Sequence, residues 1–237
     1  MDLGLDGKVA LVTAASRGLG RAAAMALSGE GARVAINARD PDRLARTASE
    51  LPGDVLPLPG DVTDAEEPAR LVAATVDRFG ALDILVGNAG GPPPARALEV
   101  EGAALHAAVE ANLLSSVRLV QAAVPHLRAA GAGRIALITS WGVKQPIPTL
   151  AYSNAARTGL WAWAKTAAQD LAGDGITLNL VCPGPHATDR ARELGLTGPM
   201  GDPADFGRVV AFLCSASAGF VSGTALQVDG AGTLGLS

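Results

Sequence analysis

The stretch Lys8-Val-Ala-Leu-Val-Thr-Ala-Ala-Ser-Arg-Gly-Leu-Gly20 decides the fold. Its first half is a short apolar run with branched side chains, which is typical of a strand buried on both faces. Small residues and two glycines follow, and a helical pattern then runs from Leu19 to Glu30. A buried strand that passes through a glycine-rich turn into a helix is the first unit of an alternating α/β fold.

The same alternation continues along the chain. Strands are expected at 8–13, 33–38, 55–59, 82–86, 134–139, 177–182 and 225–228, and helices at 19–30, 41–51, 66–79, 98–130, 149–171 and 203–215. We expect the helix over 98–130 to bend at Pro125, because proline removes one backbone hydrogen bond. No linker or repeat interrupts the pattern. The sequence therefore predicts one domain over residues 1–237, a Rossmann-type doubly wound parallel sheet of seven strands with helices on both faces.

Composition excludes several classes of protein. With 49% hydrophobic residues, 18% charged residues and a net charge of −4, the chain can bury a large core, and it carries no basic footprint for nucleic acid or an anionic membrane. No apolar stretch is long enough to span a bilayer and the N-terminus has no targeting pattern, so we expect a cytoplasmic protein. Cys182 and Cys214 are expected to be buried free thiols, and the histidines show no metal-ligand spacing.

The turn after the first strand is a candidate nucleotide-binding loop. Glycines at this place let the backbone approach a pyrophosphate at the helix N-terminus. The general fingerprint has a glycine where this chain has Ala14. Asp61 and Val62 follow another strand at the same edge of the sheet. The candidate cofactor residues of the loop are Thr13, Ala15, Ser16, Arg17, Gly18, Leu19 and Gly20.

The end of the second strand indicates which cofactor is bound. An acidic residue there would bind the adenine ribose hydroxyls and repel a 2′-phosphate. This chain has Ala38 followed by Arg39. Together with Arg17, Arg39 could clamp the 2′-phosphate, which favours NADP(H) over NAD(H). The alternative is that both are solvated surface arginines.

Several motifs in order along nearly the whole chain resemble the short-chain dehydrogenase/reductase family, in particular its 3-oxoacyl-carrier-protein-reductase-like members. The motifs are Thr13 to Gly20, Asp61-Val62, Gly87-Asn-Ala-Gly90, Asn112, Ser140, Asn179, Pro183-Gly184 through Thr188, and Val228-Asp-Gly230. The resemblance implies strand order 3-2-1-4-5-6-7, a nicotinamide cofactor, a small-molecule carbonyl substrate and a homotetramer or homodimer.

The resemblance also implies roles for single residues. Asn88, Ala89 and Gly90 resemble the adenosine-side support after the fourth strand. Asn112 resembles the helix asparagine that holds a water for proton relay, and Ser140 resembles the hydroxyl that binds the substrate carbonyl. The loop that fixes the nicotinamide amide and covers the cofactor is represented by Pro183, Gly184 and Thr188.

The chain departs from the family at its catalytic signature, a tyrosine followed four residues later by a lysine. At these positions the chain has Ser153 and Arg157, and Tyr152 stands one position early. Arg157 could replace the lysine as a cation, but an aliphatic hydroxyl such as that of Ser153 is far too weak an acid to replace tyrosine. Tyr152 is a candidate acid if it turns inward. Lys144, in the loop after Ser140, is another candidate, with a solvated loop lysine as its alternative interpretation.

Three hypotheses follow. The first is an NADP(H)-dependent oxidoreductase that interconverts a carbonyl and a secondary alcohol. The second is a dinucleotide-binding protein without redox turnover, such as a sensor or assembly subunit, and the third is non-redox chemistry in the same pocket. The segment between Thr188 and Asp202 is shorter than the substrate lid of many family members, which suggests an open or partner-completed pocket, or weak selectivity.

Overall fold

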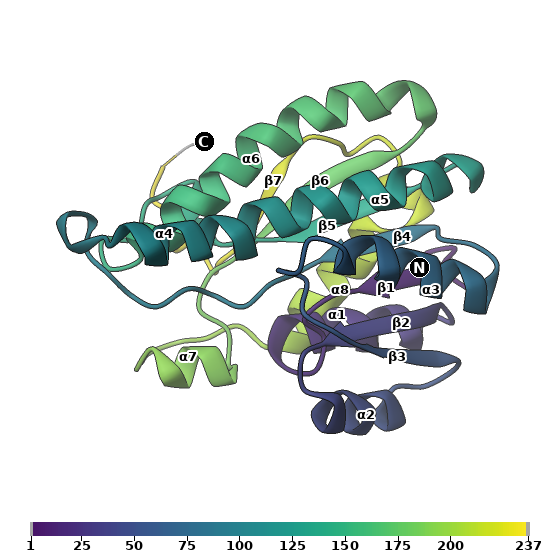
Figure 1. Ribbon diagram of the computed structural model, residues 1–237, viewed down its shortest axis with the longest axis horizontal. Helices are drawn as coiled ribbons and strands as arrows, with labels where there is room; N and C mark the ends of the chain where they lie inside the picture. The colour runs from purple at the N-terminus through teal and green to yellow at the C-terminus, as the bar shows by residue number, and fades with distance from the viewer. Residues whose placement is uncertain (1, 236–237) are drawn as a thin grey trace.

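A seven-stranded parallel sheet forms the centre of the computed structural model, which describes residues 2–235. The strand order is β3-β2-β1-β4-β5-β6-β7, and helices cover both faces (Figure 1). The strands are β1 (Val9–Val12), β2 (Arg33–Ala38), β3 (Val55–Pro59), β4 (Ile84–Gly87), β5 (Arg134–Ile138), β6 (Thr177–Pro183) and β7 (Ala225–Val228). The predicted fold class and strand order are confirmed.

Two helical layers sandwich the sheet. The helices are α1 (Gly18–Gly29), α2 (Pro41–Glu50), α3 (Glu67–Phe79), α4 (Gly102–Val109), α5 (Ser115–Ala129), α6 (Ala151–Leu171), α7 (Asp189–Glu193) and α8 (Pro203–Leu213). On one face α1 packs against α8, and on the other α3 packs against α5 while α4 packs against α6. Every residue of β1, β4, β5 and β6 is buried, because side chains on both faces of these strands enter a hydrophobic core.

The predicted continuous helix over 98–130 is wrong in its detail. The segment consists of α4, a π-helical turn at Glu110–Leu114 and α5, and Pro125 lies inside α5, which continues past it to Ala129. Within the π turn region, Ser115 Oγ donates to the Ala111 carbonyl at 2.7 Å. The irregular backbone therefore lies near the middle of the segment 98–130, and π turns of this kind are frequent at functional sites.

The carboxyl ends of β1, β4, β5 and β6 lie at one edge of the sheet because the strands are parallel. The chain order reverses between β1 and β4, which is where open α/β sheets bind their ligands. Figure 1 shows α7 apart from the two helical layers. Over residues 2–235, no helix has the length and apolar character that crossing a bilayer requires.

Candidate nucleotide and carbonyl site

The loop between β1 and α1 has the backbone that a phosphate-binding turn requires. Ala14 has φ of 46° and Gly18 has φ of 58°, both in the left-handed region that favours glycine. A Cβ atom on Gly20 would lie 2.5 Å from the Ala14 carbonyl oxygen, so this position admits no side chain. At Ala14 the chain carries a methyl group in a backbone conformation that costs about 1 kcal/mol, which explains the glycine of the general fingerprint.

Hydrogen bonds fasten this loop to the neighbouring strands. The Thr13 hydroxyl donates to the Asn88 carbonyl and accepts from the Asn88 amide, both at 2.8 Å. The Asn88 side-chain amide donates to the Ala14 carbonyl at 3.3 Å, and the Ala15 N–H donates to the Asn37 carbonyl at 2.8 Å. Thr13 and Ala15 are fully buried. Their visible function is to hold the loop in shape, and direct contact with a cofactor stays a prediction.

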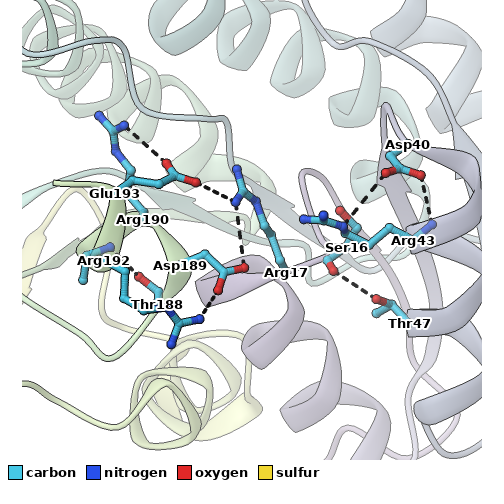
Figure 2. Close-up of polar contacts among 11 residues, drawn as sticks. Ser16, Arg17, Asp40, Arg43, Thr47, Thr188, Asp189, Arg190, Arg192 and Glu193 are labelled. Atoms are coloured by element: carbon cyan, nitrogen blue, oxygen red, sulfur yellow. Dashed lines mark hydrogen bonds and ion pairs between the residues drawn. The ribbon is translucent and has the colours of Figure 1, made fainter. Parts of the chain in front are cut away.

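The two arginines predicted to clamp a 2′-phosphate lie in different surroundings. The side chain of Arg39 is 78% exposed, with a guanidinium nitrogen 3.7 Å from a carboxylate oxygen of Asp61. Arg17 extends to α7, where its Nη1 lies 2.9 Å from Glu193 Oε1 and 3.8 Å from Asp189 Oδ2 (Figure 2). The electrostatic field of Arg17 is therefore partly compensated by two carboxylates of α7.

The other residues that were predicted to contact the adenosine lie at the same edge of the sheet. Asp61 is fixed by its own turn, since its Oδ1 accepts from the Thr63 amide at 3.0 Å and from the Thr63 hydroxyl at 2.9 Å. Val62 is buried, Ser16, Leu19 and Ala89 are half-buried, and Gly90 is exposed.

The loop after β6 lies against the end of β7. The Gly184 N–H donates to the Val228 carbonyl at 3.0 Å, and a Cβ atom at Gly184 would lie 2.7 Å from the Cα of Asp229. Glycine is therefore required here by close packing. Thr188 is the N-cap of α7, where its Oγ1 accepts from the Ala191 amide at 3.3 Å. Pro183 is the buried last residue of β6.

Arg157 of α6 is a cation buried at the ends of two strands. Its Nη1 donates to the Ile138 carbonyl at 3.0 Å, its Nη2 donates to the Ala89 carbonyl at 3.5 Å, and the residue is 7% exposed. Burial lowers the pKa of the guanidinium to about 10, so the group stays charged at neutral pH. The fork has five N–H donors, and these two bonds leave further donors for another acceptor.

Ser140 and Asn112 lie where a carbonyl and a proton relay could be bound. Ser140 lies two residues after the end of β5, and its Oγ accepts from the Gly142 amide at 3.1 Å. Asn112 lies in the π turn, which packs on α6, and is 2% exposed. Its Nδ2 donates to the Ala108 carbonyl at 3.2 Å, while its Oδ1 has no partner among the described residues. A buried oxygen of this kind calls for a water or a ligand donor.

The candidate acids point to other partners in this conformation. The Tyr152 hydroxyl accepts a hydrogen bond from the Glu101 amide at 2.9 Å, and the residue is 4% exposed. The Lys144 ammonium lies over the indole of Trp161, 4.7 Å from the ring centroid. Ser153 is buried in the same turn of α6. The Tyr152 hydroxyl therefore uses an acceptor lone pair on the start of α4 and keeps its own hydrogen for donation.

A groove lies beside this edge of the sheet, near the start of α1. It has a volume of about 820 Å³ and runs between α1, α7 and α8, and of the predicted cofactor residues it includes Gly18 and Thr188 alone. The tight glycine turn and the buried cation lie at the strand ends and their loops, so the candidate site is built there and not in this groove.

Comparison with known proteins identifies the family. A sequence model of the family described as enoyl-(acyl carrier protein) reductase matches residues 13–233. The chain belongs to the short-chain dehydrogenase/reductase family.

Its relatives within the family are reductases and dehydrogenases. The chain is 32% identical over 243 residues to dehydrogenase/reductase SDR family member 4 of Sus scrofa, covering 95% of this chain and 87% of the relative. It is 31% identical to 3-oxoacyl-[acyl-carrier-protein] reductase of Thermotoga maritima, with 95% and 98% covered. The L-sorbose reductase of Gluconobacter frateurii, solved with NADPH and L-sorbose, superimposes with a TM-score of 0.91 at 30% identity, with 97% and 98% covered.

The sequence did not reveal how this short-chain dehydrogenase/reductase places α7. This five-residue helix contacts two loops of the site, through Arg17 as described and through Arg190, whose Nη2 donates to the Pro92 carbonyl at 2.6 Å. One signal for these contacts is present in the sequence, because four of the five residues over 189–193 are charged and such a run indicates ion pairs. Their partners are distant in sequence, however, so the run alone could not identify them.

Proposed function

We propose that the chain is an NADP(H)-dependent oxidoreductase that interconverts a carbonyl and a secondary alcohol, with a 3-oxoacyl-thioester-like or another small ketone as substrate. The observation that carries the proposal is the position of Ser140 at the end of β5, on the same sheet edge as the glycine turn and the buried Arg157. Membership of a family of reductases and dehydrogenases supports it. As in that family, we expect a homodimer or homotetramer.

The residues at the sheet edge fit a dinucleotide. The turn at Gly18 and Gly20 gives the backbone room for a pyrophosphate, and Asp61 and Asn88 are held in fixed orientations beside it. Ala38 leaves the end of β2 without the carboxylate that would repel a 2′-phosphate. The preference for NADP(H) rests on this absence together with Arg17 and Arg39.

Each polar side chain of the site then has a chemical task. A nicotinamide cofactor supplies or accepts the hydride. Ser140 would donate its hydroxyl hydrogen to the substrate carbonyl and orient it. Arg157 would use its remaining N–H groups on ribose hydroxyls and would stabilise the negative charge of an alkoxide. The unpartnered Oδ1 of Asn112 would hold a water of the proton relay.

A second function is favoured by one specific observation. The Tyr152 hydroxyl accepts a hydrogen bond from the Glu101 amide, and the resemblance by spacing places Ser153 where the family has its tyrosine. A protein whose phenol stays at α4 would bind NADP(H) with little or no turnover, as a sensor or assembly subunit does. The two functions share the cofactor site and differ in whether Tyr152 reaches the substrate.

The test is NADPH oxidation at saturating cofactor across 3-oxoacyl thioesters, diketones and quinones. We expect turnover with at least one of these substrate classes, and Tyr152→Phe should lower kcat by a factor of about 10² to 10⁴ if the phenol is the acid. An unchanged kcat in Tyr152→Phe would remove this residue from the mechanism. Absence of turnover on all substrates, with NADPH still quenching tryptophan fluorescence, would support the binding protein.

A further inference from the structure

Helix α7 connects two loops at the carboxyl edge of the sheet. At one end its Glu193 pairs with Arg17 in the loop before α1, and Arg190 donates to the Pro92 carbonyl in the loop after β4. Figure 2 shows Arg17 extended between Asp189 and Glu193. The helix is thus held to both sides of the crevice in which a dinucleotide would lie.

The carboxylates that hold Arg17 use the same chemistry as a phosphate. A guanidinium fork binds carboxylate and phosphate oxygens through parallel N–H donors, so one edge of the fork holds one of these groups at a time. Glu193 Oε1 lies 2.9 Å from Arg17 Nη1, and Asp189 Oδ2 lies 3.8 Å from the same nitrogen. A phosphate arriving at Arg17 would displace these carboxylates or bind beside them against their negative charge.

The other ion pairs of α7 show that it can release Arg17 without leaving its acids unpaired. Glu193 Oε2 lies 3.6 Å from Arg190 Nη1, and Asp189 also contacts Arg192. Both carboxylates therefore keep an arginine of their own helix when Arg17 turns away. About half of the Arg17 side chain is exposed, so an exchange of partners needs no opening of the core.

We propose that Glu193 and Asp189 compete with the 2′-phosphate of NADP(H) for Arg17, so that binding of the phosphorylated cofactor releases α7 from the nucleotide loop. The proposal rests on the NADP(H) preference given above. It makes these two carboxylates determinants of cofactor selectivity, because they weaken the binding of NADP(H) while leaving that of NAD(H) unaffected. It also couples the identity of the cofactor to the position of α7, which contacts the loops after β1 and β4.

The test is a comparison of Glu193→Gln with wild type, with the Kd of NADPH and of NADH measured by tryptophan fluorescence quenching. An exposed ion pair of this kind corresponds to a factor of about two to five, so Glu193→Gln should lower the Kd of NADPH by that factor and leave the Kd of NADH unchanged. Asp189→Asn/Glu193→Gln should lower the Kd of NADPH further, and 0.5 M salt should reduce the differences.

Two controls isolate the ion pair. Asp205→Asn removes an exposed carboxylate of α8 that pairs with Arg208, and it should leave both Kd values unchanged. Arg17→Ala should weaken NADPH binding and abolish the effect of Glu193→Gln in the double variant. Hydrogen exchange gives a second measurement, in which NADPH but not NADH increases exchange of the α7 amides in the wild type.

The possible outcomes distinguish failure of the proposed competition from failure of the NADP(H) preference. Equal Kd values of NADPH for wild type and Glu193→Gln, or equal changes for NADPH and NADH, would refute the competition and leave the NADP(H) preference intact. Binding of NADH without binding of NADPH, in both proteins, would overturn the NADP(H) preference and the competition with it.

Discussion

Replacing Arg157 with methionine distinguishes a functional cation from a structural one. The drop of its pKa to about 10 corresponds to about 3 kcal/mol of unfavourable free energy for keeping the cation in its buried site at neutral pH. Methionine fills a similar volume and removes this cost. It also removes the 3.0 Å bond to the Ile138 carbonyl, whose loss costs about 1–3 kcal/mol, while the 3.5 Å bond to Ala89 contributes little.

The two contributions nearly cancel, so Arg157→Met should change the free energy of unfolding by about 0 to +2 kcal/mol, which is neutral to stabilising. The same variant should raise the Kd of NADPH at least tenfold, because the ribose loses its donors. Urea unfolding followed by circular dichroism gives the first quantity, and fluorescence quenching gives the second.

Arg134→Met is the matched control at the opposite edge of the sheet. Arg134 donates to the carbonyls of Ser215, Ala132, Gly133 and Gly175, so its loss should destabilise the protein by about 2–4 kcal/mol without changing the Kd of NADPH. If Arg157→Met destabilised the protein as much as Arg134→Met and left NADPH binding unchanged, Arg157 would be a structural tie and its assigned role would be refuted.

Three further predictions concern the loop and the thiols. Gly20→Ala should weaken NADPH binding more than tenfold in calorimetry, because its Cβ would meet the Ala14 carbonyl at 2.5 Å; wild-type affinity would contradict the assigned loop. Ellman's reagent should label neither Cys182 nor Cys214 in the native protein at pH 8, since burial raises both pKa values, that of Cys214 to about 12. The thiol of Cys214 ionises above pH 9 in the unfolded chain but stays protonated in the folded protein, so the free energy of unfolding should fall by about 1 kcal/mol between pH 9 and pH 10. Cys214→Ala should reduce this pH dependence, and an equal dependence would mean that the Cys214 thiol does not cause it.

The sequence predicted the fold because the signals for strands and turns lie within short stretches of the chain. Runs such as Val9–Val12 are apolar at every position, which suits a strand covered on both faces, and some of the helices begin at a local capping residue, as α2 does at Asp40 and α8 does at Asp202. The sequence also indicated the tight turn between β1 and α1, because Gly18 has a left-handed backbone and Gly20 has no room for a side chain, and both requirements arise within a few residues.

Contacts between distant residues could not be predicted in this way. The pairing of Arg17 with Glu193 joins positions 176 residues apart, and either residue alone looks like an ordinary solvated charge. The sequence did not predict the π turn at Glu110–Leu114, which packs against α6. Likewise, the attachment of Tyr152 to the Glu101 amide depends on where α4 begins in space.

The sequence by itself therefore determined the alternating elements, the sheet edge where the candidate site lies and the residue types available there, because hydrophobic period and glycine chemistry are local properties of the chain. The tertiary structure alone decided which partners those residues have. In the folded chain Arg157 is buried between the ends of β4 and β5, and the Tyr152 hydroxyl bonds to the start of α4. Arg17 pairs with the carboxylates of α7. Charges and hydroxyls bond to whatever the fold brings within about 3 Å, and that proximity depends on the whole chain.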